Sequence, residues 1–289
     1  MSYQQNVRLA GLMRRYGWRM GFTYGLSLLG TLFYLSYPFA IGLGIDGVLA
    51  GRPVEVLWLV SLWLLHILVD VTRQVIDTRS FARLHADIAA VLVFGQRTSG
   101  ASTSHMVARA GMARELTQFL ENDVPQLMRM AISPAICVAA LFAYDFMAGV
   151  GSLALMGVIV FGSVFVYRRS MPLNASLNDE LEREAAVIEN AHLPDVRAHY
   201  DAVAGWRIRL SDLNARAWSM NELVMVGFMS FAILRFASMP GAEVGMIYAS
   251  IGYVWRLFDS LYAVPYYIQL LPRLSDIRKR IGQLEEEQA

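Results

Sequence analysis

The sequence predicts an all-α integral membrane protein with six transmembrane helices and long cytoplasmic helical extensions. Hydrophobic residues make up 56% of the chain and charged residues only 17%, a composition outside that of ordinary soluble domains. Several apolar stretches reach the roughly 20 residues that a helix needs to cross a bilayer. No series of ten-residue alternating strands is visible, so the spans are predicted to be helices, within one transmembrane domain covering residues 1–289.

Six apolar stretches are long enough to be spans. They run approximately over residues 20–45, 54–76, 124–144, 148–167, 217–236 and 244–271. The first follows an arginine-rich start and is too long for the core of a signal peptide, so it is predicted to be a retained span.

Basic residues fall on alternate flanks of these spans. Four arginines lie within residues 1–19, six within 73–114 and seven within 168–216, whereas the three opposite loops together hold only Arg52. Because cytoplasmic flanks retain Lys and Arg, both termini are predicted to be cytoplasmic, in a bacterial-type inner (cytoplasmic) membrane.

The outer and inner connections differ in length and composition. The outer ones are short and carry turn residues at Gly51–Pro53, Gly149 and Pro240–Gly241. The inner ones, 77–123 and 168–216, are polar but rich in helix-forming residues, so the helices are expected to continue beyond the membrane. Two cytoplasmic prongs result.

A polar stripe follows the second span. His66, Asp70, Arg73 and Asp77 are spaced four, three and four residues apart, which places them on one helix face. Ionisable groups at membrane depth indicate function by default, and histidine with carboxylates can pass protons near neutral pH. The alternative is structural: the helix leaves the membrane here, Asp70 pairs with Arg73, and Asp77 is simply cytoplasmic.

The sixth span combines a charged pair with an aromatic stripe. Arg256 and Asp259 are three residues apart and are predicted to pair, with Gly252 and Ala263 on the same side. Five aromatic residues form a stripe along the same predicted helix: Tyr248, Trp255, Phe258, Tyr262 and Tyr266. Such a face suits flat or cationic solutes, but interfacial belts and helix packing also produce aromatic stripes.

Three further carboxylates and one thiol need an explanation. Glu222, in the inner half of the fifth span, is either a protonatable coupling group or the partner of an arginine on another helix. Asp46 and Glu243 lie near the outer surface, where solvation or helix capping is expected. Cys137 lies in an apolar stretch and is expected to pack as a small hydrophobic residue.

Enzymatic, metal and nucleic-acid functions receive no support. The remaining histidines lie on the inner extensions without a two-ligand helical spacing and are expected to be solvated: His85, His105, His192 and His199. No G-x-S-x-G, H-E-x-x-H or C-x-x-C motif is present. The net charge of +1 and the lack of a basic patch argue against nucleic acid as a partner, and no cofactor is predicted.

Four local runs carry a family resemblance. Residues 38–51 read P-F-A-I-G-L-G-I-D-G-V-L-A-G, and further matches lie at 119–125, 195–200 and 272–281. Together with the short outer loops and long inner helices, these runs resemble the transmembrane domain of ABC exporters of the six-helix, domain-swapped kind. The resemblance implies a homodimer in the lipid membrane that encloses a cavity and moves a small or amphipathic solute by alternating access.

The driving force is a separate question. In those exporters an ATPase follows the membrane domain, but here the only lysine, Lys279, follows Arg278 and cannot belong to a P-loop. In this respect the chain is similar to proton-driven uptake proteins of the SbmA/BacA type, which predicts ion coupling through Asp70, Glu222 and Asp259.

Two alternatives to ion coupling remain. One is a half-transporter that recruits a separate ABC ATPase through its prong tips, near residues 98–110 and 190–202. The other is a membrane scaffold or regulator that kept the fold and lost transport.

Overall fold

The computed structural model describes residues 9–98, 111, 113–190, 192–262 and 264, and every regular element in this part is helical. This confirms the predicted all-α class. The elements are α1 (Leu9–Leu49), a 3-10 turn (Pro53–Glu55), α2 (Val56–Thr98), a π-helical turn (Phe119–Asp123), α4 (Val124–Tyr144), α5 (Phe146–Glu182), α6 (Glu184–Asn190), α7 (Leu193–Ala237) and α8 (Val244–Tyr262).

Five described stretches are long and apolar enough to cross a membrane. They are Arg14–Leu49, Pro53–Val91, Ala113–Tyr144, Phe146–Glu189 and Leu193–Ala237, and they contain the first five predicted spans. Part of the sixth predicted span, 244–271, is helical as α8, but residues 263 and 265–271 lie outside the described part. Its crossing of the membrane therefore stays a prediction.

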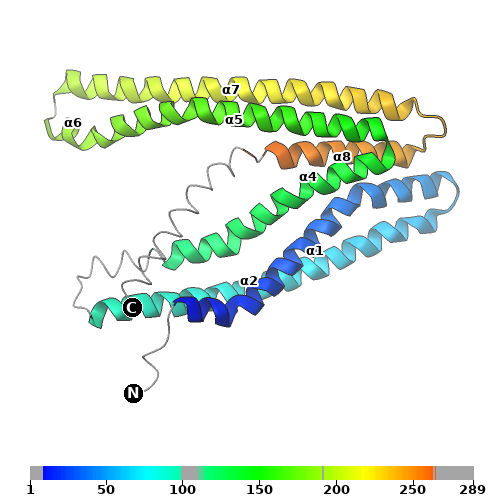
Figure 1. Cartoon of the computed structure of the whole chain (residues 1–289), viewed down its shortest axis with the longest axis horizontal. Helices are drawn as coiled ribbons and strands as arrows, with labels where there is room; N and C mark the ends of the chain where they lie inside the picture. The colour runs from blue at the N-terminus through cyan, green and yellow to red at the C-terminus, as the bar shows by residue number, and fades with distance from the viewer. Residues whose placement is uncertain (1–8, 99–110, 112, 191, 263, 265–289) are drawn as a thin grey trace, which may run out of the picture.

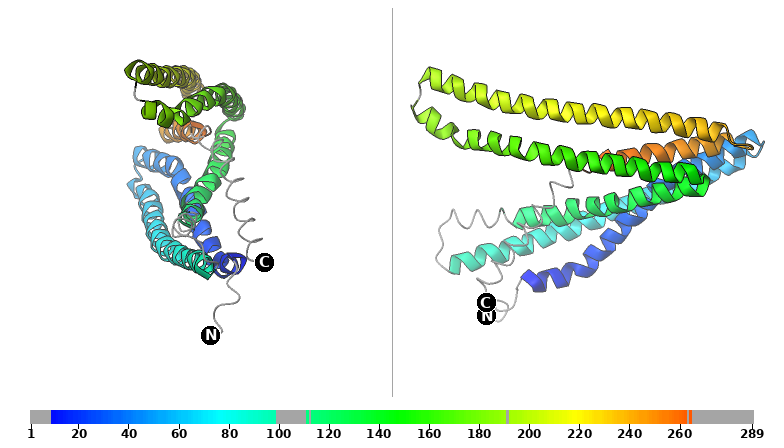
Figure 2. Two further views of the ribbon diagram at one scale, coloured as in Figure 1. Left: turned by 90° about the vertical axis from the view of Figure 1, so that its left-hand side faces the viewer. Right: turned by 45° about the horizontal axis from the view of Figure 1, so that its top comes forward.

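The helices run antiparallel, with three short connections at one end of the molecule. Figure 1 shows the α1–α2, α4–α5 and α7–α8 connections at its right and α6, at the tip of the α5–α7 hairpin, at its left. From the turns, the α1–α2 pair and the α5–α7 pair diverge (Figures 1 and 2). Helix α1 packs against α2 and α8, and α4 contacts both α5 and α8. The cavities described below lie among α1, α2, α4 and α8.

The helical extensions are packed structures. The inner part of α2 places Phe81, Leu84 and Ile88 in a buried cluster with Tyr16 and Met20 of α1. This cluster explains why a polar connection such as 77–123 can continue as helix: one face of it is covered by apolar contact. The prediction of continuing helices is confirmed for the described residues, whereas their cytoplasmic location stays a prediction.

The main core joins α4, α5, α7 and α8. It contains Cys137 and Leu141 of α4, Ile159 of α5, Phe236 of α7 and Leu257 of α8, all of them nearly inaccessible to solvent. Cys137 is fully buried among apolar side chains, which confirms its predicted role as a small hydrophobic residue.

Two of the three predicted outer turns are confirmed and one is displaced. Gly51 and Gly241 adopt φ angles of 75° and 76°, the left-handed region that glycine reaches without a Cβ clash. Gly149, by contrast, lies inside the first turn of α5, and the chain reverses at Asp145 instead. The glycine is needed there for space, because a Cβ at Gly149 would collide with the ring of Phe142.

Helix α8 is fixed to α1 by a close backbone contact. A Cβ on Gly42 would lie 2.5 Å from the carbonyl oxygen of Gly245, and a Cβ on Gly252 would lie 2.8 Å from Pro38 Cβ. Asp46 Oδ1 accepts a hydrogen bond from the Gly245 N–H at 2.6 Å. Asp46 therefore caps the start of α8, as predicted, and the contact sets the position of the α8 side chains relative to α1.

Candidate functional site

The polar stripe of α2 forms a continuous chain of contacts that begins on α1. Tyr37 Oη lies 2.5 Å from His66 Nδ1, and His66 Nε2 lies 3.2 Å from Asp70 Oδ2. If Tyr37 donates to Nδ1, the imidazole is the neutral Nε2–H tautomer, which donates to Asp70. The predicted placement of these groups on one face is confirmed, and Tyr37 extends the chain by one group.

Arg73 continues this chain toward the inner end of α2. Its guanidinium contacts Asp70 at 3.5 Å and Asp77 at 3.0 Å. The side chain of Asp77 is 12% exposed, whereas that of Asp70 is 48% exposed. Asp70, Arg73 and Asp77 thus form one continuous set of ion pairs, in which Asp70 is the more open carboxylate.

Asp70 faces a cavity of about 360 Å³ between α1, α2 and α4. Glycine at position 30 of α1 makes room for it, because a Cβ there would already lie 3.1 Å from Asp70 Oδ1. The other lining groups are mostly polar: Ser27, Thr31, Tyr34, His66, Arg73, Arg129 and Ser133. The cavity volume falls within the roughly 300 to 1,000 Å³ that is usual for a small-molecule site.

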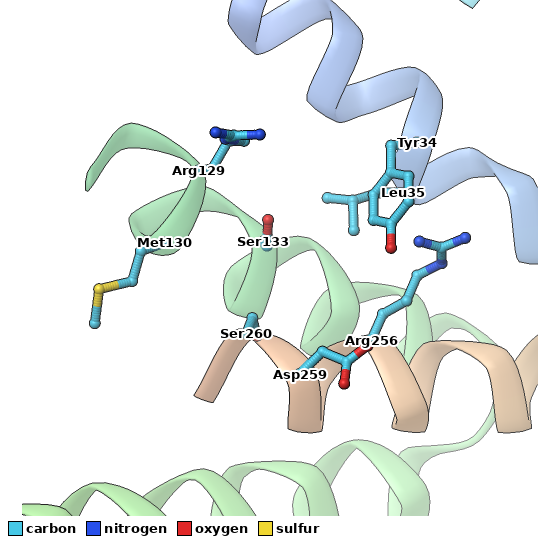
Figure 3. Close-up of a pocket in the computed structure, with 8 residues that line it drawn as sticks. All are labelled: Tyr34, Leu35, Arg129, Met130, Ser133, Arg256, Asp259 and Ser260. Carbon is cyan, nitrogen blue, oxygen red and sulfur yellow. The ribbon is translucent and has the colours of Figure 1, made fainter. Parts of the chain in front are cut away.

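The predicted ion pair between Arg256 and Asp259 is wrong. No ion pair among the described residues joins them; instead the Arg256 guanidinium lies 3.8 Å from the ring centroid of Tyr34, over its face. Figure 3 shows the Arg256 side chain reaching from α8 toward Tyr34 on α1. The three-residue spacing permits a pair, but the aromatic ring of the neighbouring helix offers the cation a cation–π contact.

The aromatic stripe of α8 divides between two environments. Tyr248 and Trp255 line a cavity of about 400 Å³ together with Arg256 and Asp259, so both can contact a solute. Phe258 is buried in the main core, and its ring centroid lies 6.1 Å from that of Tyr262. Tyr266 lies outside the described residues. Packing therefore explains Phe258.

A smaller cavity of about 220 Å³ connects these two sites through shared residues. Tyr34 lines all three cavities, Arg129 and Ser133 line the small one and the α2 cavity, and Arg256 and Asp259 line the small one and the α8 cavity (Figure 3). The two constellations that the sequence placed on separate helices thus meet around Tyr34.

Sequence reasoning missed Tyr34, Tyr37, Arg129 and Ser133. Arg129 carried a usable signal, because it is a charge inside the apolar stretch 124–144 with Ser133 one turn further on. Tyr34 and Tyr37 carried no signal that distinguishes them from other aromatic residues.

Arg129 lies at membrane depth. At about 1.5 Å per helical residue, it lies roughly 25 Å along α4 from its outer turn, within a hydrocarbon core of about 30 Å.

Glu222 is not part of this arrangement. It lies on α7, half-buried, and lines none of the cavities described above. Its predicted role in coupling therefore gains no geometric support from the cavity.

Arg235 of α7 has its carboxylate partner at the outer turn. It contacts Asp145 through two hydrogen bonds, from Nε at 3.1 Å and from Nη2 at 2.8 Å. The Ala148 N–H also donates to this carboxylate, at 2.9 Å. The hydrogen bonds from Arg235 in the first place, and that from Ala148, hold the pKa of Asp145 below its usual range.

The prediction of solvated histidines is wrong for His199. Its side chain is 1% exposed, and its Nδ1 lies 2.8 Å from Glu180 Oε1. The reason is that α5 and α7 pack along the extension and bring Glu180 opposite His199. His85 is half-buried, with no partner for Nδ1 among the described residues. His192 is exposed as predicted, and His105 lies outside the described part.

A protein-family model matches most of the chain. The model of the ABC transporter transmembrane region matches residues 9–245, which is most of the chain and includes α1, α2, α4, α5 and α7. No curated protein matches the chain.

Proposed function

Because the chain belongs to the family of ABC transporter transmembrane regions, we propose that this multi-pass membrane protein transports a small or amphipathic solute through the cavities among α1, α2, α4 and α8. One observation carries the proposal: the Tyr37–His66–Asp70 chain and the Arg256 site of α8 meet around Tyr34. A structural ion pair would require no such cavity beside it.

We further propose that protons drive this transport through Asp70. The carboxylate bonds to His66 on one side and to Arg73 on the other. Protonation would remove its charge, weaken both contacts and leave Arg73 bound to Asp77 alone. A proton taken up from one side of the membrane would thereby change the cavity wall, which is the coupling that alternating access needs.

A homodimer is part of this proposal, on the strength of the sequence resemblance and of the uncovered face of α2. None of the most apolar window of α2 is buried by its own chain, and Trp58, Leu64 and Leu68 are exposed. Such a face meets lipid or a second copy. Light scattering of the purified protein should give twice the chain mass of 32.3 kDa after the detergent is subtracted; a monomer mass would contradict the dimer.

We propose that the α6 end faces the cytoplasm, since the inner flanks carry most of the arginines. The single cysteine is buried, so one introduced cysteine reports its own exposure. In intact cells a membrane-impermeant maleimide should label Ser238→Cys and should leave Asp195→Cys unlabelled until the cells are opened. The reverse pattern would invert the orientation.

A separate ATPase remains the second candidate for the driving force. The observation in its favour is the tip of the α5–α7 hairpin, where α6 and the start of α7 expose Ile188 and Leu193. Apolar side chains at the end of a polar extension are suited to contact with another protein.

Reconstitution distinguishes the two candidates. Proteoliposomes containing the purified protein alone would be tested for uptake of three dansyl compounds, one cationic (dansylcadaverine), one anionic (dansylglycine) and one zwitterionic (Nε-dansyl-lysine). Proton coupling predicts that a pH gradient drives accumulation of at least one compound without ATP and that a protonophore stops it. Accumulation of none of them without a co-purifying ATPase and ATP would refute proton coupling.

A further inference from the structure

Three charged side chains on the cavity wall have no ion-pair partner in the described part of the chain. Among the described residues, no ion pair involves Arg129 of α4, Arg256 of α8 or Asp259 of α8, although all three line the small cavity beside Tyr34. Arg73 differs, because Asp70 and Asp77 already occupy its guanidinium. Arg129 and Asp259 are exposed and Arg256 is half-buried, so their charged groups are open to a partner in the cavity. At membrane depth, water or a ligand of opposite charge stabilises such groups.

Arg256 is held ready for such a partner. Its guanidinium carbon lies over the Tyr34 ring, 3.8 Å from the ring centroid, while its buried Nη1 atom has no hydrogen-bond acceptor in the part of the chain that the structure describes. A guanidinium that contacts an aromatic ring keeps N–H donors, and these match a carboxylate or phosphate oxygen. Figure 3 shows Arg129 on α4 bordering the same space, with Ser133 one turn along that helix.

Asp259 supplies the opposite charge on the same wall. It lies on α8 beside Arg256 and lines both the small cavity and the cavity that contains Tyr248 and Trp255. These aromatic side chains are large and partly exposed, and they offer flat apolar surface and cation–π contact.

We propose that these cavities bind a zwitterionic solute with a flat apolar body: its anionic group between Arg129 and Arg256, its cationic group on Asp259, and its body against Tyr248 and Trp255. A purely cationic solute would place no anionic group beside the two arginines, and a purely anionic one would place no cationic group beside Asp259. This assignment deepens the proposed transport function and rests on it for its biological meaning.

Equilibrium binding in detergent, without any gradient, tests the assignment separately from transport. Dansyl fluorescence would be titrated with the purified protein for three compounds that share one chromophore: Nε-dansyl-lysine, dansylglycine and dansylcadaverine. The zwitterion is expected to bind about tenfold or more tightly than either single-charge compound, the usual effect of one charge-assisted hydrogen bond. Equal affinities for all three, or no binding of the zwitterion, would overturn the proposal.

Three charge-removing variants identify the ends of the ligand. Arg129→Gln and Arg256→Gln are expected to weaken Nε-dansyl-lysine about tenfold and leave dansylcadaverine no weaker, whereas Asp259→Asn should weaken Nε-dansyl-lysine and spare dansylglycine. The control is Arg197→Gln, because Arg197 forms an exposed pair with Asp201 on α7, away from the cavity. If the cavity variants behave like the control, or if they abolish the dimer instead, these charges serve another contact and the proposal fails.

Different results refute the binding site and the transport function. Selective zwitterion binding without gradient-driven uptake would refute proton coupling and keep the binding site. Gradient-driven uptake of a compound without zwitterion preference would refute the site and keep the transport function.

Discussion

Asp145 and Asp70 both contact an arginine, but the two carboxylates are surrounded in opposite ways. Asp145 joins the α4–α5 turn to Arg235 of α7 through two short hydrogen bonds, and 7% of its side chain is exposed. Asp70 shares Arg73 with Asp77, contacts His66 as well, and faces a cavity with 48% of its side chain exposed. The enclosed contacts of Asp145 connect two helices, whereas Asp70 has open, shared contacts, which is why the proposed coupling is assigned to it.

The largest expected effect separates these two carboxylates by function. Asp70→Asn should reduce gradient-driven uptake per folded protein about a hundredfold, because the neutral amide cannot bind and release a proton. Asp145→Asn should change the same rate less than about threefold, since its contacts lie outside the cavities. Initial rates in proteoliposomes measure both. Similar losses in the two variants would remove the distinction between a structural contact and a coupling group.

The next largest effect is expected on protein stability, at the close contact between α1 and α8 beside the cavities. Gly245→Ala would place a methyl group against the backbone of Gly42, where neither helix can yield, and should destabilise the protein by about 1–3 kcal/mol. Thermal unfolding in detergent measures the change. The matched control is Gly227→Ala on α7, which meets open space and should be neutral or slightly stabilising. If both variants behave alike, the close α1–α8 contact is not what positions Arg256.

A smaller effect tests the start of the contact chain. Tyr37→Phe removes the hydroxyl beside His66 Nδ1 while keeping the ring, and the loss of one hydrogen bond should lower the uptake rate about fivefold. Because Tyr37 acts through His66, the pH dependence of uptake should change as well. Tyr167→Phe on α5, away from the cavities, is the control. A Tyr37→Phe profile identical to that of the unchanged protein would limit the chain to His66 and Asp70.

The smallest effect is expected for the Asp145–Arg235 ion pair, and it is expected on stability and not on transport. Asp145→Asn should lower the melting temperature by roughly 2–4 °C at pH 7. Arg235 holds the pKa of Asp145 below its usual value, so the ion pair stabilises the fold above about pH 4 and is lost as the pH falls through the lowered value. The difference between variant and parent should therefore be constant from pH 5 to 8 and shrink below about pH 4. A difference that grew on acidification would contradict the sign of this shift.

The sequence is sufficient to predict the helices, but it is not sufficient to predict which side chains of different helices contact each other. Periodicity and apolar length suffice for the helices and for the shared face of His66 and Asp70, because both depend on neighbours within one helix. The same reasoning paired Arg256 with Asp259, its neighbour along α8. The structure gives Arg256 a partner from α1, Tyr34, more than two hundred residues away in the chain.

The solvent exposure of individual side chains could not be predicted from the sequence either. His199 lies in a polar stretch that looks solvated, yet α5 packs against it and places Glu180 at 2.8 Å. Phe258 and Trp255 stand three residues apart in one aromatic stripe, and only the packing of α8 against the core separates the buried ring from the cavity ring. Such assignments depend on how whole helices approach one another, which no local spacing encodes.

The most direct test of the central claim is the proton movement that accompanies solute movement. Proteoliposomes loaded with a pH-sensitive dye would receive Nε-dansyl-lysine without a preformed gradient, so that any change in internal pH comes from coupling. We expect the solute to move protons across the membrane in the parent protein and in Asp145→Asn, and we expect Asp70→Asn to abolish this movement. Solute entry without proton movement in the parent, or proton movement preserved in Asp70→Asn, would contradict it.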